Sequence, residues 1–391
     1  MKTELINFIK YNKFFYKIYY HIGSALIAVL RPFIKINDKR VIFISFGGRK
    51  YDDSPKAIYE KMLMDEDMRN YEFIWAFINP EQHTIPRGRK IKVDTPQYYT
   101  TLLSSRIWIT NSGVQRGLRI PHKSSICINT WHGTPIKTMW KDISSNNASF
   151  KGNGSFMDVD VLLSQCTYEA DTFSKALNLP KSRFAVIGYP RNDELVTRNN
   201  EDEILSIKTR LGIPYDKKVI LYAPTFREYN KTKGNNCSFL MPLNFDKWAE
   251  RLSDEYILLI RAHYEVTKNV NFANSDFVKN TSTYNHLNEL MLISDILISD
   301  YSSIFFDYSI LERPMLAYCY DYDLYKETRG LYFDIREALD SNFTNEDELI
   351  SEIASLKYDH RVAIARNFKK RFIEHYGDAS DRCIKLIKSR L

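Results

Sequence analysis

The chain has 391 residues, of which 44% are hydrophobic and 26% are charged. This composition is typical of a folded protein of about two or three domains, and it excludes wholesale disorder and collagen-like or repeat-dominated chains. No run of about 18 uncharged apolar residues occurs, which excludes a polytopic membrane protein. The formal net charge of +7 is mild, and it fits an anionic partner such as a membrane surface, a phosphorylated substrate or nucleic acid.

Residues 1–37 are predicted to form an amphipathic helical segment that associates with a membrane. Lysines alternate there with Phe and Tyr, and a short apolar stretch over 22–30 ends at Arg31 and Pro32. The stretch is too short to cross a bilayer comfortably, and the basic region before it is too long and too aromatic for a signal peptide. Lysine suits anionic headgroups, while Tyr and Phe suit the acyl boundary. The alternative is a helix that packs on its own domain.

Beyond residue 38, short apolar runs bounded by turn residues alternate with helical stretches. This pattern predicts buried, mostly parallel strands in a first Rossmann-like domain, residues 38–190. The predicted strands are 41–46, 73–78, 107–109, 126–128 and 159–163.

A turn-rich break over 188–193 separates this domain from a second one, residues 191–391, which ends in helices from about residue 344. Its predicted strands are 219–223, 256–260, 296–299 and 315–318. The fold class is therefore α/β, with two Rossmann-like halves. Ligands of such sheets bind beyond the carboxyl ends of the strands, so motifs at strand ends of both halves should meet in one cleft.

The first candidate site residue is His132, on a tight loop directly after the predicted strand 126–128. An imidazole can accept a proton from a hydroxyl near neutral pH. The neighbouring Gly133 permits close approach of a ligand to the backbone. The alternative is a histidine that is structural or merely exposed.

A second group of candidates suits a phosphate or diphosphate. Arg261 and His263 follow the predicted strand 256–260, and Ser302 and Ser303 stand where a helix is expected to begin. Guanidinium, imidazole, hydroxyl and helix-start N–H groups all bind phosphate oxygens. The alternative for the serines is simple helix capping, for which Asp300 is equally suited.

Three further residues could contribute to the same anion site. Arg191 and Arg227 are each interpreted as lying just past a strand end, and Asp307 lies one helical turn beyond Ser303. There is no GxxxxGK[ST] or GxGxxG loop. The acidic pair Asp321 and Asp323 is interpreted as a solvated loop, and the five cysteines as buried thiols. We therefore expect no metal and no cofactor, with the phosphates neutralised by Arg, His and helix dipoles.

Six segments together resemble the CDP-glycerol:glycerophosphotransferase family of teichoic acid and capsule synthesis. The resemblance runs from about residue 40 to residue 375. The segments are SFGGRKYDDSPKAIYE (45–60), NTWHGTPIKTMW (129–140), GYPRND (188–193), YAPTFR (222–227), RAH (261–263) and SDYSSIFFDYSILERPMLAY (299–318).

This resemblance implies a GT-B-like fold and transfer of glycerol phosphate or ribitol phosphate from a CDP-alditol, with CMP as the leaving group. His132 would be the general base, with Gly133 and Thr134 on the acceptor side. His263 and Arg261 would stabilise the diphosphate and the departing CMP. The remaining roles concern the donor: Ser302 and Ser303 would bind its phosphates, Asp307 would lie near its glycerol end, and Asp300 would order the helix start.

The resemblance also implies a place and an acceptor. The protein would be peripheral at the cytoplasmic face of the bacterial membrane, held at an anionic surface. The acceptor would be an undecaprenyl-diphosphate-linked glycan or a growing polymer, and the chain length resembles that of primases. Two alternatives stay open: a GT-B glycosyltransferase that uses a CMP-sugar such as CMP-sialic acid, and a non-catalytic membrane-bound scaffold. No nucleic-acid-binding motif is recognised.

Overall fold

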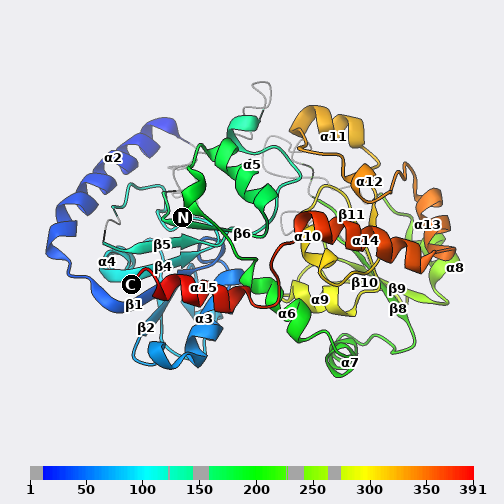
Figure 1. The fold of residues 1–391 in the computed structure, drawn as a ribbon, viewed down its shortest axis with the longest axis horizontal. Helices are drawn as coiled ribbons and strands as arrows, with labels where there is room; N and C mark the ends of the chain where they lie inside the picture. The colour runs from blue at the N-terminus through cyan, green and yellow to red at the C-terminus, as the bar shows by residue number, and fades with distance from the viewer. Residues whose placement is uncertain (1–11, 122–123, 144–157, 226, 228–241, 263–273) are drawn as a thin grey trace.

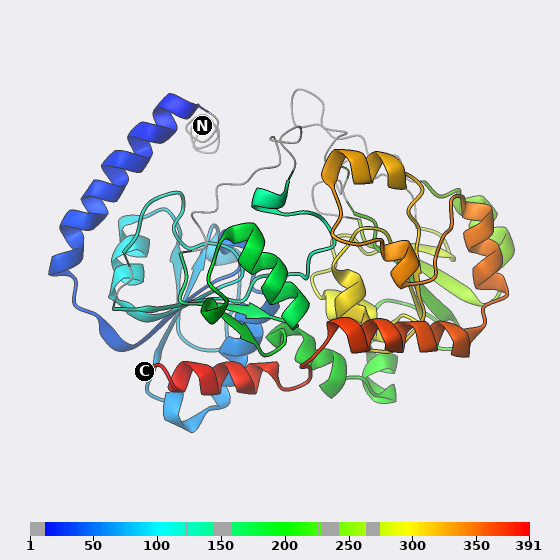
Figure 2. The same cartoon turned by 45° about the horizontal axis from the view of Figure 1, so that its top comes forward.

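The computed structural model describes residues 12–121, 124–143, 158–225, 227, 242–262 and 274–391. Within these ranges the chain forms two parallel β-sheets, and each sheet is packed with helices (Figures 1 and 2). The predicted α/β class with parallel strands is confirmed. The half that contains the first sheet lies on the left of Figure 1, and the second half lies on the right.

The first sheet has the strand order β3-β2-β1-β4-β5-β6-β7 in the described residues. Its strands are β1 (Asn37–Ile44), β2 (Glu72–Phe77), β3 (Arg89–Lys92), β4 (Ser105–Thr110), β5 (Ile126–Asn129), β6 (Val161–Ser164) and β7 (Phe184–Val186). Successive side chains of a strand point to opposite faces, so Val41 and Phe43 join one core cluster while Ile42 and Ile44 join another. Both faces are buried, which is why these strands read as continuous apolar runs.

The second sheet has the order β10-β9-β8-β11-β12 in the described residues. Its strands are β8 (Lys218–Tyr222), β9 (Tyr256–Ile260), β10 (Val278–Asn280), β11 (Ile296–Ser299) and β12 (Met315–Ala317). In each sheet the first strand of the chain lies inside the sheet, and the strand order reverses beside it. Such a reversal opens a crevice at the carboxyl edge of the sheet, where ligands bind.

Every apolar run predicted as a strand forms one, within a few residues at its ends. The described part also contains β3, β7 and β10, which the runs do not predict. In β3 only Ile91 is buried, and β10 has three residues of which only Val278 is buried. Strands this short, with one buried side chain, leave no hydrophobic pattern to detect.

The helices surround the two sheets (Figure 1). In the first half these are α2 (Lys13–Leu30), α3 (Asp53–Met64), α4 (Pro96–Ser104) and α5 (Thr167–Leu177). The second half contains α6 (Glu194–Thr197), α7 (Glu201–Arg210), α8 (Phe245–Leu252), α9 (Leu287–Ile293), α10 (Ile304–Ser309), α11 (Tyr322–Arg329), α12 (Ile335–Ala338), α13 (Glu346–Ala354) and α14 (Tyr358–Phe372).

The last helix, α15 (Ala379–Lys388), returns to the first half, where it lies beside α3 (Figure 1). Cys383, Ile384 and Ile387 are buried in the core cluster that also contains Val41 and Phe43 of β1. A second domain that extends unbroken from 191 to 391 therefore does not describe the packing. The C-terminal helix completes the first half because its apolar face covers one side of the first sheet.

Helix α2 shows two different faces. One face packs on the first half: Ile27 is buried, the Tyr19 hydroxyl donates to the Arg116 carbonyl at 3.0 Å, and the Arg119 N–H donates to Ser24 Oγ at 3.0 Å. The other face leaves large apolar side chains exposed, namely Phe14, Ile18, Ile22, Leu26, Val29 and, just beyond the helix, Phe33. None of the helices described here is long and apolar enough to cross a membrane.

A strap from the first half is built into the second half. The strap is residues 136–139, and it follows the loop that carries His132. Lys137 forms an antiparallel β-bridge with Leu331, and the Thr138 N–H donates to the Gly330 carbonyl at 3.1 Å. The Ile136 side chain lies in the core cluster of the second half. The strap thereby ties the His132 loop to both halves.

Candidate active site

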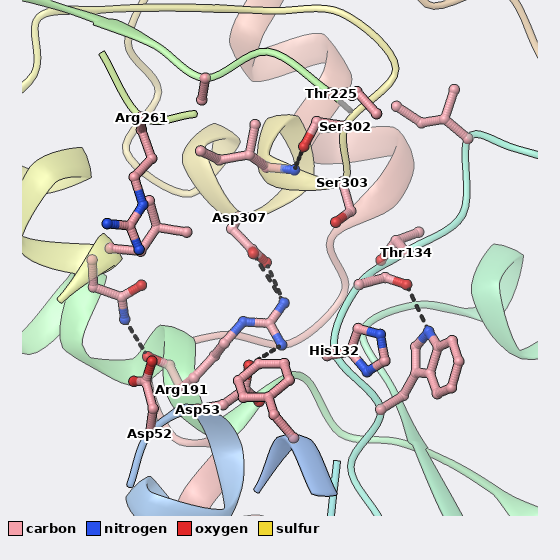
Figure 3. Close-up of a pocket in the computed structure, with 18 of the residues that line it drawn as sticks. Asp52, Asp53, His132, Thr134, Arg191, Thr225, Arg261, Ser302, Ser303 and Asp307 are labelled. Atoms are coloured by element: carbon pink, nitrogen blue, oxygen red, sulfur yellow. Dashed lines mark hydrogen bonds and ion pairs between the residues drawn. The ribbon is translucent and has the colours of Figure 1, made fainter. Parts of the chain in front are cut away.

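A cleft of about 560 Å³ lies between the two halves, at the carboxyl edges of both sheets (Figure 3). Residues from both halves line it. From the first half come His132, Gly133, Thr134, Arg191 and residues of the 45–60 segment. From the second half come Thr225, Arg261, Ser302, Ser303 and Asp307. The predicted meeting of strand-end motifs in one cleft is therefore observed for these residues.

His132 follows β5, and its ring is open to the cleft. Its Nδ1 lies 2.7 Å from the Asn111 carbonyl oxygen, and a carbonyl can only accept, so Nδ1 carries the proton. Nε2 is then the basic nitrogen. Trp131 stacks on the ring at 4.2 Å between centroids, and Phe46 lies 5.9 Å away. The crowding of the cleft walls lowers the pKa of His132, because it removes water that would stabilise the imidazolium.

Gly133 places the His132 loop against the start of α10. A Cβ atom at this position would lie 2.4 Å from Ser303 Oγ. Close approach at Gly133 was predicted for a ligand, but in the structure the close neighbour is a side chain of the second half. Thr134 is buried, and its hydroxyl donates to Glu169 at 2.9 Å.

Ser302 and Ser303 both line the cleft and are half-buried. Ser302 Oγ accepts from the Ile304 N–H at 3.3 Å, so this hydroxyl also supports the helix start. The helix begins at Ile304, two residues later than predicted. Ser302 therefore supports the start of the helix and also lines the cleft, so the two interpretations of this segment do not exclude each other.

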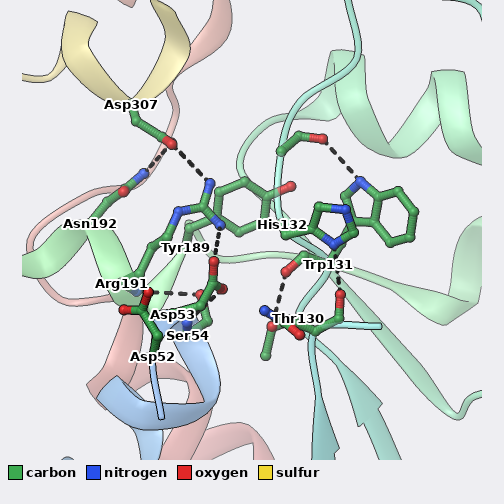
Figure 4. A network of polar contacts seen from close by, with 12 residues as sticks. Asp52, Asp53, Ser54, Thr130, Trp131, His132, Tyr189, Arg191, Asn192 and Asp307 are labelled. Carbon is green, nitrogen blue, oxygen red and sulfur yellow. Dashed lines mark hydrogen bonds and ion pairs between the residues drawn. The ribbon is translucent and has the colours of Figure 1, made fainter. Parts of the chain in front are cut away.

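Arg191 and Asp307, predicted separately, are paired with each other across the two halves (Figures 3 and 4). One guanidinium nitrogen lies 2.9 Å and 3.2 Å from the two Asp307 oxygens, and another lies 3.5 Å from Asp53. The Asn192 amide donates to Asp307 at 2.6 Å. The two carboxylates raise the pKa of Arg191 against the opposing effect of burial, so the guanidinium remains a fixed cation.

Arg227 and Asp300 lie away from the cleft, among the buried residues of the second half. Arg227 donates to Asp300 at 2.8 Å and forms two bonds to Asp321, of 2.6 Å and 3.0 Å. Tyr301, Tyr320 and Tyr325 surround its guanidinium. This geometry does not support direct binding of the CDP-alditol by Arg227, because its guanidinium already bonds to the carboxylates of Asp300 and Asp321. The interpretation of Asp321 as solvated is wrong, because its carboxylate is largely buried and paired with Arg227.

Asp300 orders the loops beside the cleft. It accepts from the Thr225 N–H at 2.8 Å and from the Tyr301 N–H at 2.7 Å. It thus holds the loop after β8 against the loop after β11, and acts on the cleft wall rather than on a ligand.

Arg261 lines the cleft, and one of its guanidinium nitrogens donates to the carbonyls of Thr281 and Ser282, at 2.8 Å and 3.1 Å, and to that of Tyr284. These bonds fix a cation on the wall opposite α3, where Asp52 lies (Figure 3). The second predicted histidine, His263, lies outside the described residues. No group of three or more His, Cys, Asp or Glu side chains that could hold a metal ion is found in the part of the chain that the structure describes.

The sequence analysis missed the acidic and basic residues that follow β1. Lys50, Asp52, Asp53 and Lys56 line the cleft, and burial raises the pKa of Asp52. The segment 45–60 contributes to the family resemblance, yet its individual residues are not predicted as site residues. Its position after a strand at the reversal of the sheet order is the signal that could have found them.

Parallel sheets whose strand ends meet at a cleft with fixed cations and hydroxyls are typical of α/β enzymes that bind anionic ligands. Comparison with known proteins gives the family. The chain belongs to the CDP-Glycerol:Poly(glycerophosphate) glycerophosphotransferase family, whose model matches residues 26–389. The family resemblance seen in the motifs is confirmed, and the protein is a glycerophosphotransferase-family enzyme.

Individual relatives agree with this assignment. The teichoic acid poly(glycerol phosphate) polymerase of Bacillus spizizenii is 32% identical over 367 residues, 90% of each chain. That of Staphylococcus epidermidis is 37% identical over 78% of this chain, but the match spans only 43% of the longer relative. A solved structure of a variant of the wall teichoic acid polymerase TagF, soaked with CDPG, is 33% identical, with a TM-score of 0.82 over 94% of this chain and 92% of that chain.

Proposed function

We propose that the protein transfers glycerol phosphate from CDP-glycerol to a hydroxyl of a lipid-linked glycan or growing teichoic acid polymer, and releases CMP. The observation that carries the proposal is the contact between the His132 loop and Ser303, which brings a base and an anion-binding wall from different halves together. Family membership supports glycerol phosphate as the transferred group. The soak of the similar TagF variant with CDPG supports CDP-glycerol as the donor.

In the proposed reaction, the acceptor oxygen bonds to the phosphorus that carries glycerol. The bond between that phosphorus and the CMP oxygen breaks, and its electron pair leaves with CMP. Nε2 of His132 takes the acceptor proton, because Nδ1–H is engaged by the Asn111 carbonyl. Arg261 and the hydroxyls of Ser302 and Ser303 stabilise the diphosphate and the charge on the departing CMP.

The other candidates take supporting roles in this proposal. Gly133 and Thr134 shape the acceptor side, and Asp307 lies toward the glycerol end, oriented by Arg191. His263 is assigned to the leaving CMP by the family resemblance alone. No step requires a metal, so the reaction should continue in the presence of EDTA.

We further propose a GT-B-like division of labour, in which the first half binds the acceptor and the second half binds the CDP-alditol. The exposed apolar face of α2 would sit in an anionic membrane surface, with the cleft open to lipid-linked acceptor. The protein would then be peripheral at the cytoplasmic face of the membrane, where an undecaprenyl-diphosphate-linked glycan is available. Primase action, which adds the first unit, is the proposed role, and a relative of this kind is the teichoic acid glycerol-phosphate primase of Bacillus subtilis, 28% identical over 84% of this chain.

The test measures CMP release by the purified protein, with a lipid-linked disaccharide as acceptor. CDP-glycerol, CDP-ribitol and CMP-sialic acid are compared, each with and without EDTA. Replacing a general base costs about 10²- to 10⁴-fold in rate, which is the loss expected for His132→Ala. His360→Ala is the matched control, because His360 is exposed on α14 and is not among the residues that line the cleft.

CMP from CDP-glycerol that is insensitive to EDTA and lost only in His132→Ala supports the proposal. CMP from CDP-ribitol alone would change the donor and keep the chemistry. CMP from the sialyl donor alone would replace the proposal with glycosyl transfer. Equal rates for His132→Ala and wild type would remove His132 as the base.

A further inference from the structure

Glu169 is a fully buried carboxylate close to the cleft, and the proposed reaction gives it no role. It lies in the first turn of α5, and none of its surface is exposed. Its carboxylate accepts from the Thr134 hydroxyl at 2.9 Å, from the Gln165 N–H at 3.1 Å and from the Tyr189 hydroxyl. No ion pair joins it to a cation among the described residues. A buried carboxylate held only by neutral donors costs stability, so this position calls for a reason beyond packing.

Two of the three donors belong to segments that line the cleft. Thr134 lies two residues after His132, on the same loop. Tyr189 packs its ring under the guanidinium of Arg191, 4.3 Å from the ring centroid (Figure 4). Arg191 in turn pairs with Asp307 of the second half. One carboxylate therefore connects the loop of the base with the cation that reaches the donor half.

The two oxygens of Glu169 bind different segments, the His132 loop and the segment of Tyr189 and Arg191. The oxygen Oε2 takes Thr134 and Gln165, and the oxygen Oε1 takes Tyr189. The two oxygens of a carboxylate are rigidly spaced, so the position of the His132 loop is fixed relative to Tyr189. The backbone N–H of Gln165 anchors this unit to the end of β6, inside the first sheet.

We propose that Glu169 is a positioning residue for the transfer reaction, which holds the His132 loop through Thr134 and the Arg191 segment through Tyr189 in one fixed relation. This inference rests on the proposed function, because it takes His132 to be the base. Displacing a reacting group by about 1 Å can cost about a hundredfold in rate. Loss of the Glu169 contacts should therefore lower kcat much more than it raises the KM for CDP-glycerol.

The experiment combines Glu169→Gln and Thr134→Val in a double-mutant cycle on CMP release. Each single variant should lose about tenfold to a hundredfold in kcat, with little change in donor KM. The double variant should be no slower than the slower single variant, because both changes break the same connection. Thr134→Ser keeps the hydroxyl and should retain most of the wild-type kcat. Tyr308→Phe removes a buried hydroxyl bond, to Ser294, away from the cleft, and should leave kcat unchanged.

Three outcomes would each overturn the inference: losses in kcat that multiply in the double variant, an unchanged kcat in the single variants, or loss of activity in Thr134→Ser.

A second measurement needs no substrate. It is nitrogen NMR of the His132 ring, whose signals are identified by their loss in His132→Asn. In Glu169→Gln and Thr134→Val the Nδ1 signal should shift, because a displaced loop changes the bond from Nδ1–H to the Asn111 carbonyl. Ring signals identical to wild type would refute the positioning role, even if the wild type released no CMP and the proposed function itself had failed.

Discussion

Gly133 and Ser303 touch across the two halves so closely that a methyl group on Gly133 would overlap Ser303. An ideal Cβ at position 133 would lie 2.4 Å from Ser303 Oγ and 2.9 Å from Ser303 Cβ. The His132 loop and the start of α10 are therefore in van der Waals contact, with room for glycine alone. This contact limits how closely the His132 loop can approach the cleft wall that contains Ser302 and Ser303.

The first prediction tests that contact. Gly133→Ala should lower kcat by about tenfold or more, because the loop and α10 must move apart. Adding Ser303→Gly removes both clashing atoms, so the double variant should be as active as Ser303→Gly alone. Gly212→Ala is the control: it has open space around it, so only its strained positive φ should reduce stability, and CMP release should not change. Equal activity of Gly133→Ala and wild type would contradict the steric argument.

The second prediction concerns pH. Crowding lowers the pKa of His132 below its ordinary value of 6.5, so the imidazole stays neutral and basic under mildly acidic conditions. The kcat/KM for CMP release, measured between about pH 5 and pH 8, should rise to a plateau with its midpoint below pH 6.5. The same shift stabilises the fold above pH 6.5, and this stability is lost as the pH falls through the lowered pKa. A midpoint above 6.5 would contradict this account.

The third prediction concerns the pair of Arg191 with Asp307. Arg191→Met leaves the Asp307 and Asp53 carboxylates without their shared cation, and both are largely buried. Breaking a buried pair in this way costs about 3–5 kcal/mol, which should appear as a clearly lower thermal unfolding midpoint. Arg382→Met breaks an exposed pair with Asp378 on α15, and we expect the midpoint to stay where it is. Similar midpoints for both variants would show that the Arg191 pair contributes little.

The fourth prediction concerns membrane binding. Ile22→Gln with Leu26→Gln removes two side chains of the exposed α2 face, each 58% exposed, without changing charge. Sedimentation with anionic lipid vesicles should fall severalfold, because less apolar area enters the interface. Leu205→Gln changes an exposed apolar side chain on α7 and should bind vesicles as the wild type does. Undiminished sedimentation of the α2 variant would leave packing on the first half as the only role of this helix.

The strands were predictable because buried parallel strands leave apolar runs, as in Val41–Ile44 of β1 and Tyr256–Ile260 of β9. Strand β3 leaves no such run, since Ile91 alone is buried there. The return of α15 to the first sheet was not predictable either. An amphipathic helix shows which of its faces is buried, but it does not show which sheet it covers.

The sequence predicted the site residues correctly only where a position just after a strand is enough to place the side chain in the cleft. His132, Arg261, Ser302 and Ser303 follow strands and line the cleft. Arg227 also follows a strand, yet its side chain turns inward to two carboxylates. Distance along the chain places a residue at a sheet edge, but the partners that a side chain finds depend on segments far away in sequence.

The residues missed at the site have the same explanation. Asp52 and Asp53 line the cleft because β1 lies where the strand order reverses. The strand order cannot be predicted from any local pattern in the sequence. Glu169 is a charged residue in a helix, which ordinarily faces solvent. Only the assembled fold shows that it lies between Thr134 and Tyr189.

The place of α15 has a consequence for the order in which the two cores are completed. Cys383, Ile384 and Ile387 fill the core beside β1, so the interior of the first half is complete only once α15 has docked. The core clusters of the second half, Ile136 apart, run from Leu195 to Ile373 and are available earlier. The second half can therefore close its core without α15, whereas the first half cannot. If α15 leaves its place, the apolar side of the first sheet that it covers becomes exposed, and exposed surface of this kind promotes aggregation.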